Sequence, residues 1–211
     1  GFVSYWAVPS DARTAVAGRW RRGPGRALFD ALARELCPRP LGRGPGLPLV
    51  AEDLGVITPA VQRLRDELEL PGMIVLQFGF DPADRHSPHR PENHLEHRLI
   101  YTSTHDQDTV RGWYETLVGA RRELVDRALA SHGIAEQQSW WGVIRLAFAS
   151  PARVAIVAAQ DVLGLGSEAR MNDPARAGAN WRWRMDPGTL TPALARRLRE
   201  ATEEAGRSPI S

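Results

Sequence analysis

The sequence predicts an α/β fold made of parallel strand–helix units, and two observations support this prediction. Short apolar runs alternate along the chain with segments of helical periodicity. Polar or acidic residues lie just past the C-terminal end of each apolar run. The four runs with this pattern are 47–51, 73–78, 98–102 and 154–159.

Two architectures fit this alternation. Four strand–helix units amount to half of a (β/α)8 barrel, which carries its functional side chains at the carboxyl ends of its strands. A doubly wound open sheet gives the same alternation, and periodicity does not separate the two. No glycine-rich phosphate loop follows any of the runs, which disfavours the dinucleotide-binding form of the open sheet.

Local signals predict the N-terminal elements. Aromatic and glycine residues indicate a loop over 1–25. A helix is predicted over 26–36 because leucines recur every four residues, at Leu28, Leu32 and Leu36. The run 47–51 indicates a strand that ends on Glu52 and Asp53.

The rest of the chain repeats this plan. Thr58 is predicted as a helix N-cap with Pro59 at the first helical position, and this helix should reach about Leu68. A buried strand over 73–78 should end near Asp81. The later predicted elements are a polar loop (82–97), a strand (98–102), helices over 108–130 and 136–149, a strand (154–159) and an amphipathic helix (191–204).

Composition and charge narrow the functional class. A hydrophobic content of 43% and a charged content of 25% are typical of a globular domain with a packed core. The formal net charge of +2 disfavours a nucleic-acid partner. No apolar run approaches the roughly 20 residues that a bilayer span requires, so no membrane partner is expected. The single cysteine, Cys37, is predicted to be an unreactive thiol and favours a cytoplasmic location.

Four histidines in the predicted loop 82–97 raise the question of a metal site. They are His86, His89, His94 and His97. Their spacing is loose, and no cysteine or acid pattern accompanies them. A solvated loop without a metal is therefore the preferred interpretation.

Acids at strand ends are the main candidates for chemistry. Glu52 follows the first predicted strand directly, and Asp106 follows the third within Thr104-His105-Asp106. Cleavage of an acetal requires one carboxylic acid that protonates the leaving oxygen and carboxylates that stabilise an oxocarbenium-like transition state. From position alone, the same acids could instead cap the following helices or bind a metal.

Aromatic residues in predicted loops favour a sugar ligand, because flat rings stack against the C–H faces of pyranose rings. Core packing is the alternative for any single tryptophan, and Trp140 and Trp141 are predicted to be core residues. The other aromatics considered are Trp6, Trp20, Phe78, Phe80, Trp113, Trp181 and Trp183.

Seven sequence blocks carry a family resemblance. They are GRW with GPG (18–25), AEDLGVITP (51–59), LPGM with VLQF (70–78), YTSTHDQDT (101–109), QDVLGLG (160–166), RMN (170–172) and GANWRWR (178–184). In this order they resemble the 4-α-glucanotransferases of glycoside hydrolase family 77.

The resemblance implies that residues 1–211 form the C-terminal half of a (β/α)8 barrel of the α-amylase type. It implies transfer of α-1,4-glucan segments between maltodextrins by a retaining double displacement, with no metal and no cofactor. Glu52 matches the general acid/base, and Asp106 matches the acid that binds sugar hydroxyls and stabilises the transition state. The matches to substrate-binding residues are Asp53, His105, Asn172, Phe78 and Asp81.

The family's nucleophilic aspartate has no counterpart among these residues. It lies in an Arg-x-Asp-His-Phe-Arg stretch that immediately precedes the Gly-Phe with which this chain opens. Gln107 also departs from the family, which usually has asparagine there. The leading hypothesis is therefore the acid/base half of a glucanotransferase. The alternatives are an inactive, truncated glucan-binding fragment with unpaired sheet edges, and a related α-glucan hydrolase.

Overall fold

The computed structural model describes residues 1–36, 46–178 and 180–207. The chain divides into two compact units, Gly1–Met73 and Ile74–Ser211, and each is described by itself. The prediction for Cys37 lies outside the described residues. No helix among the described residues combines the length and the apolar character that a membrane crossing needs.

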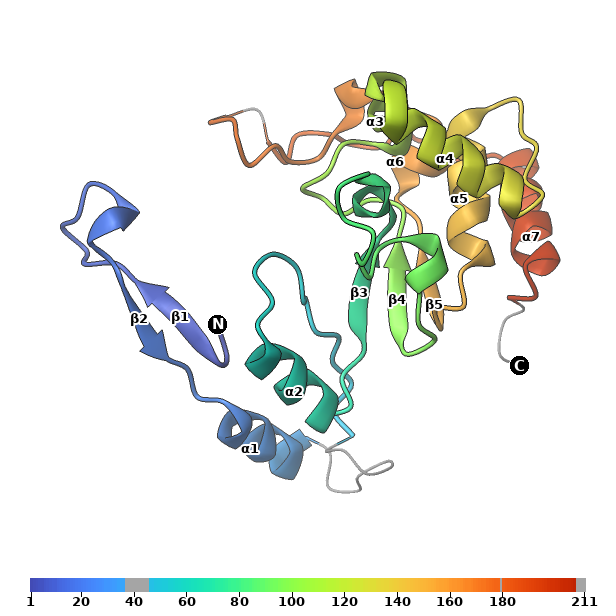
Figure 1. The fold of residues 1–211 in the computed structure, drawn as a ribbon. Helices are drawn as coiled ribbons and strands as arrows, with labels where there is room; N and C mark the ends of the chain where they lie inside the picture. Colours follow the sequence, from blue (N-terminus) through green and yellow to red (C-terminus); the bar gives the residue numbers. More distant parts are fainter. Residues whose placement is uncertain (37–45, 179, 208–211) are drawn as a thin grey trace. The chain divides into compact units, whose positions relative to one another are not determined.

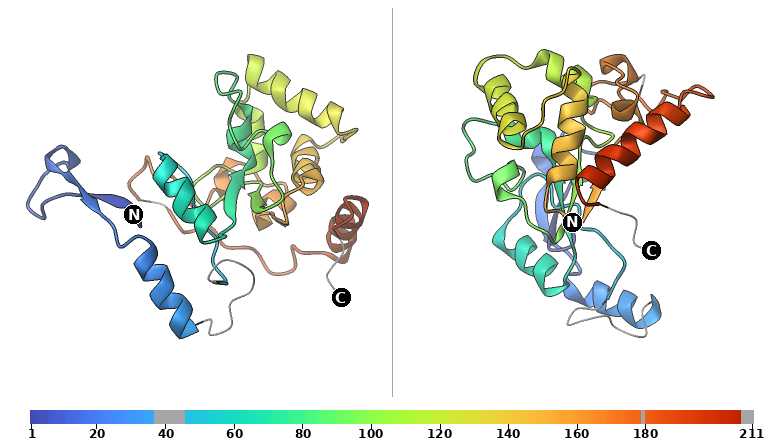
Figure 2. Two further views of the ribbon diagram at one scale, coloured as in Figure 1. Left: turned by 60° about the horizontal axis from the view of Figure 1, so that its bottom comes forward. Right: turned by 90° about the vertical axis from the view of Figure 1, so that its right-hand side faces the viewer.

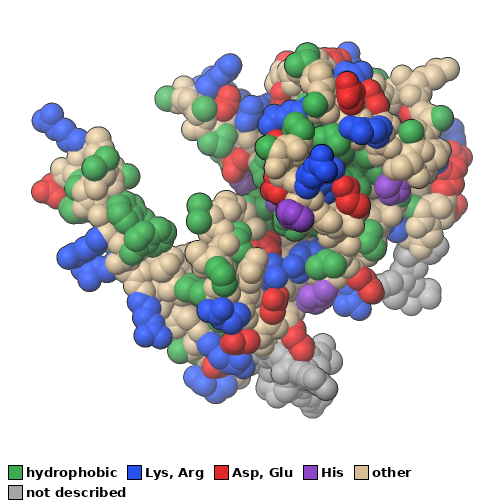
Figure 3. All heavy atoms as spheres, in the orientation of Figure 1, with side chains coloured by type: hydrophobic (Ala, Val, Ile, Leu, Met, Phe, Trp, Pro, Cys, Tyr) green, Lys and Arg blue, Asp and Glu red, His purple; other side chains and the backbone are tan. Residues whose placement is uncertain are grey.

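The first unit begins with an antiparallel hairpin, where a loop was predicted over 1–25 (Figure 1). Its strands are β1 (Ser4–Ala7) and β2 (Arg19–Arg22). Trp6 lies opposite Trp20, with ring centroids 5.4 Å apart. Such aromatic cross-strand pairs stabilise antiparallel ladders, which explains why the loop prediction was wrong. Apolar side chains gather on this hairpin in the space-filling view (Figure 3).

Two helices complete the first unit and confirm the predictions for their segments. They are α1 (Arg26–Leu36) and α2 (Pro59–Glu67), the latter with Thr58 as N-cap and Pro59 in its first turn. A small core includes Phe29 of α1, and Leu64 of α2 is partly buried against it. The members of this core are Phe29, Leu47, Leu68 and Leu70.

The strand predicted over 47–51 does not form, although the backbone at Ala51 donates one hydrogen bond to Pro71 (2.8 Å). Pro48 has no N–H to give to a ladder. Leu49 and Asp53 each donate back to the carbonyl two residues earlier, at 2.8 and 3.0 Å, which bends the chain into three-residue turns. These turns take the backbone groups that a strand would have paired.

The second unit contains a sheet with the strand order β3-β4-β5. The strands are β3 (Gly72–Val75), β4 (Arg98–Tyr101) and β5 (Val154–Ile156). β4 and β5 run parallel, as the alternating pattern predicts. The strand predicted over 73–78 is too long, because Leu76–Phe80 forms a short 3-10 helix, η2, directly after β3.

Helices cover this sheet and form most of the core. The helix predicted over 108–130 is broken into two, α3 (Val110–Thr116) and α4 (Gly119–Ser131), at a Gly119 whose φ is +54°. α5 (Ser139–Ala149) lies between α4 and α7 (Pro192–Glu204) in both views of Figure 2. The short α6 (Ala159–Val162) follows β5. Three 3-10 turns complete the elements: η1 (Ala15–Ala17), η3 (Pro91–Asn93) and η4 (Ser167–Ala169).

The core of the second unit centres on α5. Trp141 is 2% exposed, which confirms its predicted core role, and the Arg197 guanidinium lies 4.0 Å from its ring centroid. Trp140 is partly buried against the same core. The sheet strands contribute Ile74 and Ile100 to this packing. The C-terminal ends of the strands are thereby fixed on a rigid base.

Leu146 and Leu95 form a matched pair for testing this core. Leu146 is 1% exposed on α5, whereas Leu95 is 58% exposed in the loop before β4. In a full-length protein that carries this chain, we expect Leu146→Ala to lower the free energy of unfolding by about 2–5 kcal/mol. Leu95→Ala should change it by less than about 0.5 kcal/mol. Urea unfolding of both variants checks this; equal losses would contradict the described core.

Candidate active site

A buried carboxylate anchors the loop after β4 through hydrogen bonds. Asp161, on α6 after β5, is fully buried. It accepts hydrogen bonds from the Thr102 and Ser103 hydroxyls (2.7 and 2.8 Å) and from the backbone N–H of Val110 (2.7 Å). One side chain therefore joins the end of β4, the start of α3 and the segment after β5.

The pKa of Asp161 reflects two opposing effects. Burial raises it, because a charged carboxylate is poorly solvated inside the protein. The hydrogen bonds from Val110, Thr102 and Ser103 lower it, and the nearby charge of Asp108 raises it further. Burial prevails, so the pKa lies above its ordinary value.

Asp108 receives two further bonds that fix the same loop. The Ser167 hydroxyl donates to its Oδ2 (2.6 Å), and the buried Gln77 amide donates to its backbone oxygen (2.8 Å). Gln107 accepts from the backbone and hydroxyl of Thr104 at 3.0 and 2.5 Å. Gln107, which stands where the family usually has asparagine, therefore stabilises the loop.

Asp106 lies where these constraints meet. Asn172 donates from its side-chain amide to Asp106 Oδ1 (2.5 Å), and its backbone N–H donates to the His105 carbonyl (3.0 Å). Arg170 donates to the Asp106 backbone oxygen (2.6 Å). His105 Nε2 lies 3.3 Å from Asp106 Oδ1. Three of the predicted site residues are thus brought together, with the Asp106 side chain 41% exposed to solvent.

Trp181, one of the aromatic residues considered for a sugar ligand but not among the predicted site residues, adds an aromatic wall. Its ring centroid lies 5.0 Å from that of His105, and the residue is 54% exposed. Its φ of +63° is unusual for a bulky side chain and is held by a hydrogen bond from its N–H to the Met171 carbonyl (2.7 Å). Strained residues of this kind concentrate at functional sites. The family block at 178–184 was the sequence signal that pointed to it.

Glu52 and Asp53 lie in the first unit and have contrasting surroundings. The Asp53 side chain is 7% exposed and pairs with Arg65 (2.5 Å), while its Oδ1 accepts from the Met73 N–H (2.7 Å). A Cβ at position 72 would lie 2.3 Å from Asp53 Oδ2, so Gly72 permits this approach. Glu52 is exposed at the centre of the three-residue turn between Ala51 and Asp53. Asp53 anchors the turn, and Glu52 is presented by it.

The Arg65 partner of Asp53 is itself held tightly. Burial alone would lower the pKa of its guanidinium. Hydrogen bonds to Asp53 and Asp66, together with their charges, outweigh burial and raise that pKa. The Arg65 guanidinium therefore stays charged beside Asp53, and the described contacts of Asp53 are structural.

Phe78 and Asp81 lie after β3 in the second unit. Phe78 is 42% exposed and packs edge-on against His89, with ring centroids 5.5 Å apart. Asp81 accepts from the Ala83 N–H (3.0 Å) and lies 3.7 Å from Arg121. Both side chains are accessible from solvent, as a substrate contact requires.

The histidine-rich loop differs from its prediction at His89 and His94. His89 is partly buried, and its Nδ1 accepts a hydrogen bond from the Val75 N–H (3.2 Å). His86 and His97 are exposed, but His94 is only 9% exposed. Its two ring nitrogens contact the Ser150 hydroxyl (2.9 Å) and the His89 carbonyl (3.0 Å), and burial lowers its pKa. The solvated-loop prediction was wrong for His94, because the loop folds back onto the end of α5. No group of three or more metal-binding side chains occurs among the described residues.

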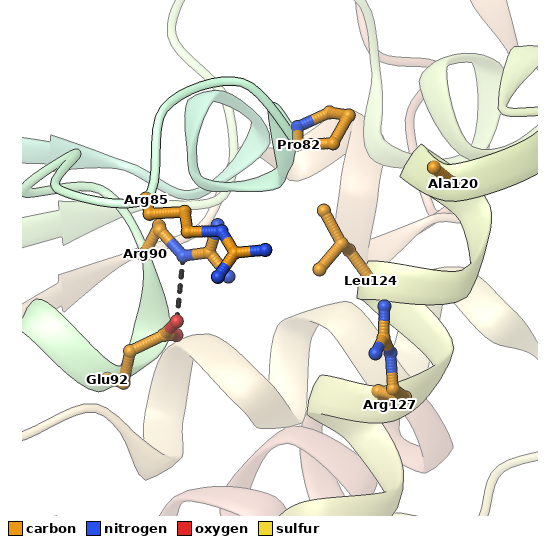
Figure 4. Close-up of a pocket in the computed structure, with 7 residues that line it drawn as sticks. All are labelled: Pro82, Arg85, Arg90, Glu92, Ala120, Leu124 and Arg127. Carbon is orange, nitrogen blue, oxygen red and sulfur yellow. Dashed lines mark hydrogen bonds and ion pairs between the residues drawn. The ribbon is translucent and has the colours of Figure 1, made fainter.

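A cavity of about 390 Å³ lies between the loop after β3 and one face of α4 (Figure 4). Arg85, Arg90 and Arg127 project toward it, and Arg90 is paired with Glu92 at 2.7 Å. None of the predicted site residues is among those that line it. Its described lining has no aromatic ring, so it lacks the surface on which a sugar would stack.

Comparison with known proteins identifies the family of this chain. A sequence model described as 4-alpha-glucanotransferase (glycoside hydrolase family 77) matches residues 1–191. The chain belongs to this family. It is 45% identical over 211 residues to the 4-alpha-glucanotransferase of Thermus thermophilus, covering 96% of this chain and 40% of that protein. It is 44% identical over 210 residues to the chloroplastic/amyloplastic 4-alpha-glucanotransferase of Solanum tuberosum, covering 98% of this chain and 34% of that protein.

Solved structures agree with the fold. The amylomaltase from Streptococcus agalactiae in complex with acarbose matches with a TM-score of 0.87 and 31% identity, over 99% of this chain and 40% of that one. The Corynebacterium glutamicum amylomaltase, at 18% identity and a TM-score of 0.69, supports the fold alone, over 98% of this chain and 34% of that one. These matches confirm the α/β prediction and are consistent with part of a (β/α)8 barrel. The chain spans about a third to two fifths of the length of these relatives.

The buried carboxylate of Asp161 generates a prediction on pH. Because its folded pKa is raised, its contribution to the free energy of unfolding is fully present below the ordinary pKa of aspartate. That contribution is lost as pH rises through the raised pKa. Asp161→Asn cannot titrate, so the stability of the parent relative to this variant should be greater at about pH 4 than at about pH 7.

Urea unfolding of a full-length protein that carries this chain, at both pH values, measures this difference. Asp161→Ala serves as the second variant. It leaves the buried Val110 N–H without its acceptor and should cost about 1–3 kcal/mol for that group alone. A parent-to-Asn difference that does not change with pH would contradict the assignment.

Proposed function

We propose that this chain supplies the acid/base half of a 4-α-glucanotransferase active site that acts on α-1,4-glucans. The observation that carries the proposal is the cluster of His105, Asp106 and Asn172 beside the exposed ring of Trp181. Hydrogen-bonding groups beside a flat ring suit a pyranose, which has polar edges and apolar faces. Family membership and the acarbose complex of the Streptococcus relative support a glucan ligand.

Asp106 is suited to hold sugar hydroxyls. Its Oδ1 is occupied by the Asn172 amide and faces His105, which fixes the orientation of the carboxylate. Because the carboxylate is held in one orientation, its Oδ2 has a fixed position from which it can accept a hydrogen bond from a hydroxyl of the donor sugar. A carboxylate that is already oriented loses little freedom on binding, and its charge stabilises a developing oxocarbenium ion. Asp106 therefore acts as the transition-state stabiliser in this proposal.

Glu52 acts as the general acid and then the general base. It first protonates the glycosidic oxygen as the bond breaks, while a nucleophilic carboxylate attacks the anomeric carbon and forms a covalent glycosyl intermediate. It then removes the proton from the 4-hydroxyl of an acceptor glucan, which displaces the carboxylate and forms a new α-1,4 bond. The nucleophile of this double displacement comes from residues other than those of this chain, none of which matches the family's nucleophile motif.

The remaining predicted site residues have distinct parts in the proposal. Phe78 and Asp81 offer exposed contacts to the substrate beyond β3. Asp53 acts through Glu52, because its ion pair with Arg65 fixes the turn that presents Glu52. In this proposal the chain forms the C-terminal half of the catalytic barrel. The enzyme acts in the cytoplasm and uses no metal or cofactor.

Glu52→Gln tests the acid/base role. Glutamine keeps the shape of the side chain but neither protonates the leaving oxygen nor accepts the acceptor proton. In a full-length protein that carries this chain, we expect conversion of maltotriose to glucose and longer maltodextrins to slow by at least about 100-fold. Glu67→Gln, at an exposed position on α2, is the matched control and should retain the parental rate. A near-parental rate for Glu52→Gln would sink the assignment.

Product analysis separates the glucanotransferase from a related α-glucan hydrolase. A transferase conserves the number of glycosidic bonds, so reducing ends should stay nearly constant while the maltodextrin lengths redistribute. A hydrolase would increase reducing ends steadily from the first minutes. We expect maltotriose to be redistributed into other chain lengths with little gain in reducing ends. Chromatography and a reducing-sugar assay on the same samples measure the two quantities.

A further inference from the structure

A cavity of about 330 Å³ adjoins the candidate active site along the chain. This volume lies at the lower end of the range for small-molecule sites, about 300–1,000 Å³. It is bounded by the segment after α6 and by the segment after Trp181. Its lining residues are Leu163, Leu165, Trp183, Arg184, Asp186 and Thr189.

The chemistry of this lining suits a sugar ring. Trp183 is partly buried and contributes an indole, and the two leucines extend the apolar surface. Asp186 contributes a carboxylate, and the hydroxyl of Thr189 is anchored by donation to the Asp186 backbone oxygen (2.9 Å). An apolar wall with polar groups at its rim matches the apolar faces and hydroxyl edges of glucose. The cavity in Figure 4 offers arginines without such a wall.

A rigid backbone segment links this cavity to the active site. Trp183 follows Trp181 by two residues, a separation of at most about 7 Å along the chain. Arg184 donates to the carbonyl oxygens of both Trp181 (3.1 Å) and Trp183 (2.8 Å). These bonds fix the direction of the segment between the Trp181 ring at His105 and the cavity wall at Trp183.

We propose that this cavity is an additional glucan-binding subsite, which holds a glucose unit of a long α-1,4-glucan whose reacting end lies at Asp106. The inference rests on the proposed function. It assigns Trp183 as the stacking surface and Asp186 as a hydroxyl acceptor. A glucan long enough to occupy both positions gains a contact that a sugar bound at Asp106 alone lacks, so chain-length preference is set partly at Trp183.

Trp183→Ala and Trp183→Phe test the subsite in a full-length protein that carries this chain. We expect Trp183→Ala to lower the ratio of kcat/KM for maltoheptaose over maltotriose by about tenfold. Trp183→Phe keeps an aromatic face and should restore most of that ratio. Leu190→Ala is the control, because Leu190 is 56% exposed in the same segment and does not line the cavity. It should leave the ratio unchanged.

Direct binding separates failure of the subsite from failure of the proposed function. Calorimetric titration of maltoheptaose into the Glu52→Gln protein measures affinity without turnover. Adding Trp183→Ala should weaken this affinity about tenfold, and adding Asp186→Ala should weaken it less. If the parent transfers no glucan but Trp183→Ala still weakens binding, the proposed function fails and the subsite stands. If affinity is unchanged, or if both substrates suffer equally in kcat/KM, the subsite is overturned.

Discussion

The buried carboxylate of Asp161 is the constraint on which the candidate active site depends. It is fully buried, yet it receives three hydrogen bonds from the end of β4 and the start of α3. Without it, two buried hydroxyls and a buried N–H would lose their acceptor, at a cost of about 1–3 kcal/mol for each unsatisfied group. The loop that carries His105 and Asp106 is therefore held in a conformation that keeps these three groups paired.

Asp106 and Asp161 show how surroundings divide the work between two carboxylates. Asp161 has no exposed surface, so it cannot touch a sugar, and burial favours its protonated form. Asp106 is bonded on one oxygen by Asn172 and is open to solvent on the other side. Asp161 is closed to solvent and serves as a structural hydrogen-bond acceptor, whereas Asp106 is accessible to solvent and has a fixed orientation. The same division separates Asp53, buried against Arg65, from the exposed Glu52.

The sequence predicted those elements whose signal is local. The leucine spacing over 26–36 matches α1, and the Thr-Pro pair at 58–59 marks the start of α2. The hairpin was missed because Trp6 and Trp20 pair across fourteen residues, which no periodicity records. For the site, position and the family blocks predicted Asp106, and the family blocks alone predicted Asn172; the structure brings the two side chains into contact. The hydrogen bonds that Asp161 accepts come from residues more than fifty positions away, so its role emerged only from the structure.

Trp181 extends this reasoning from the loop to the substrate. A bulky side chain at φ +63° is disfavoured by about 1–3 kcal/mol unless its neighbours over-determine it. Here the neighbours do so, because Met171 accepts its N–H while Arg184 donates to its carbonyl. The strain turns the indole toward His105, and the segment then leads on to Trp183. A backbone that relaxed into the ordinary β region would move the ring away from His105 and break the line of aromatic surface. The strained conformation thus holds Trp181 beside His105 at the start of the segment that leads to Trp183, the residue on which the proposed subsite depends.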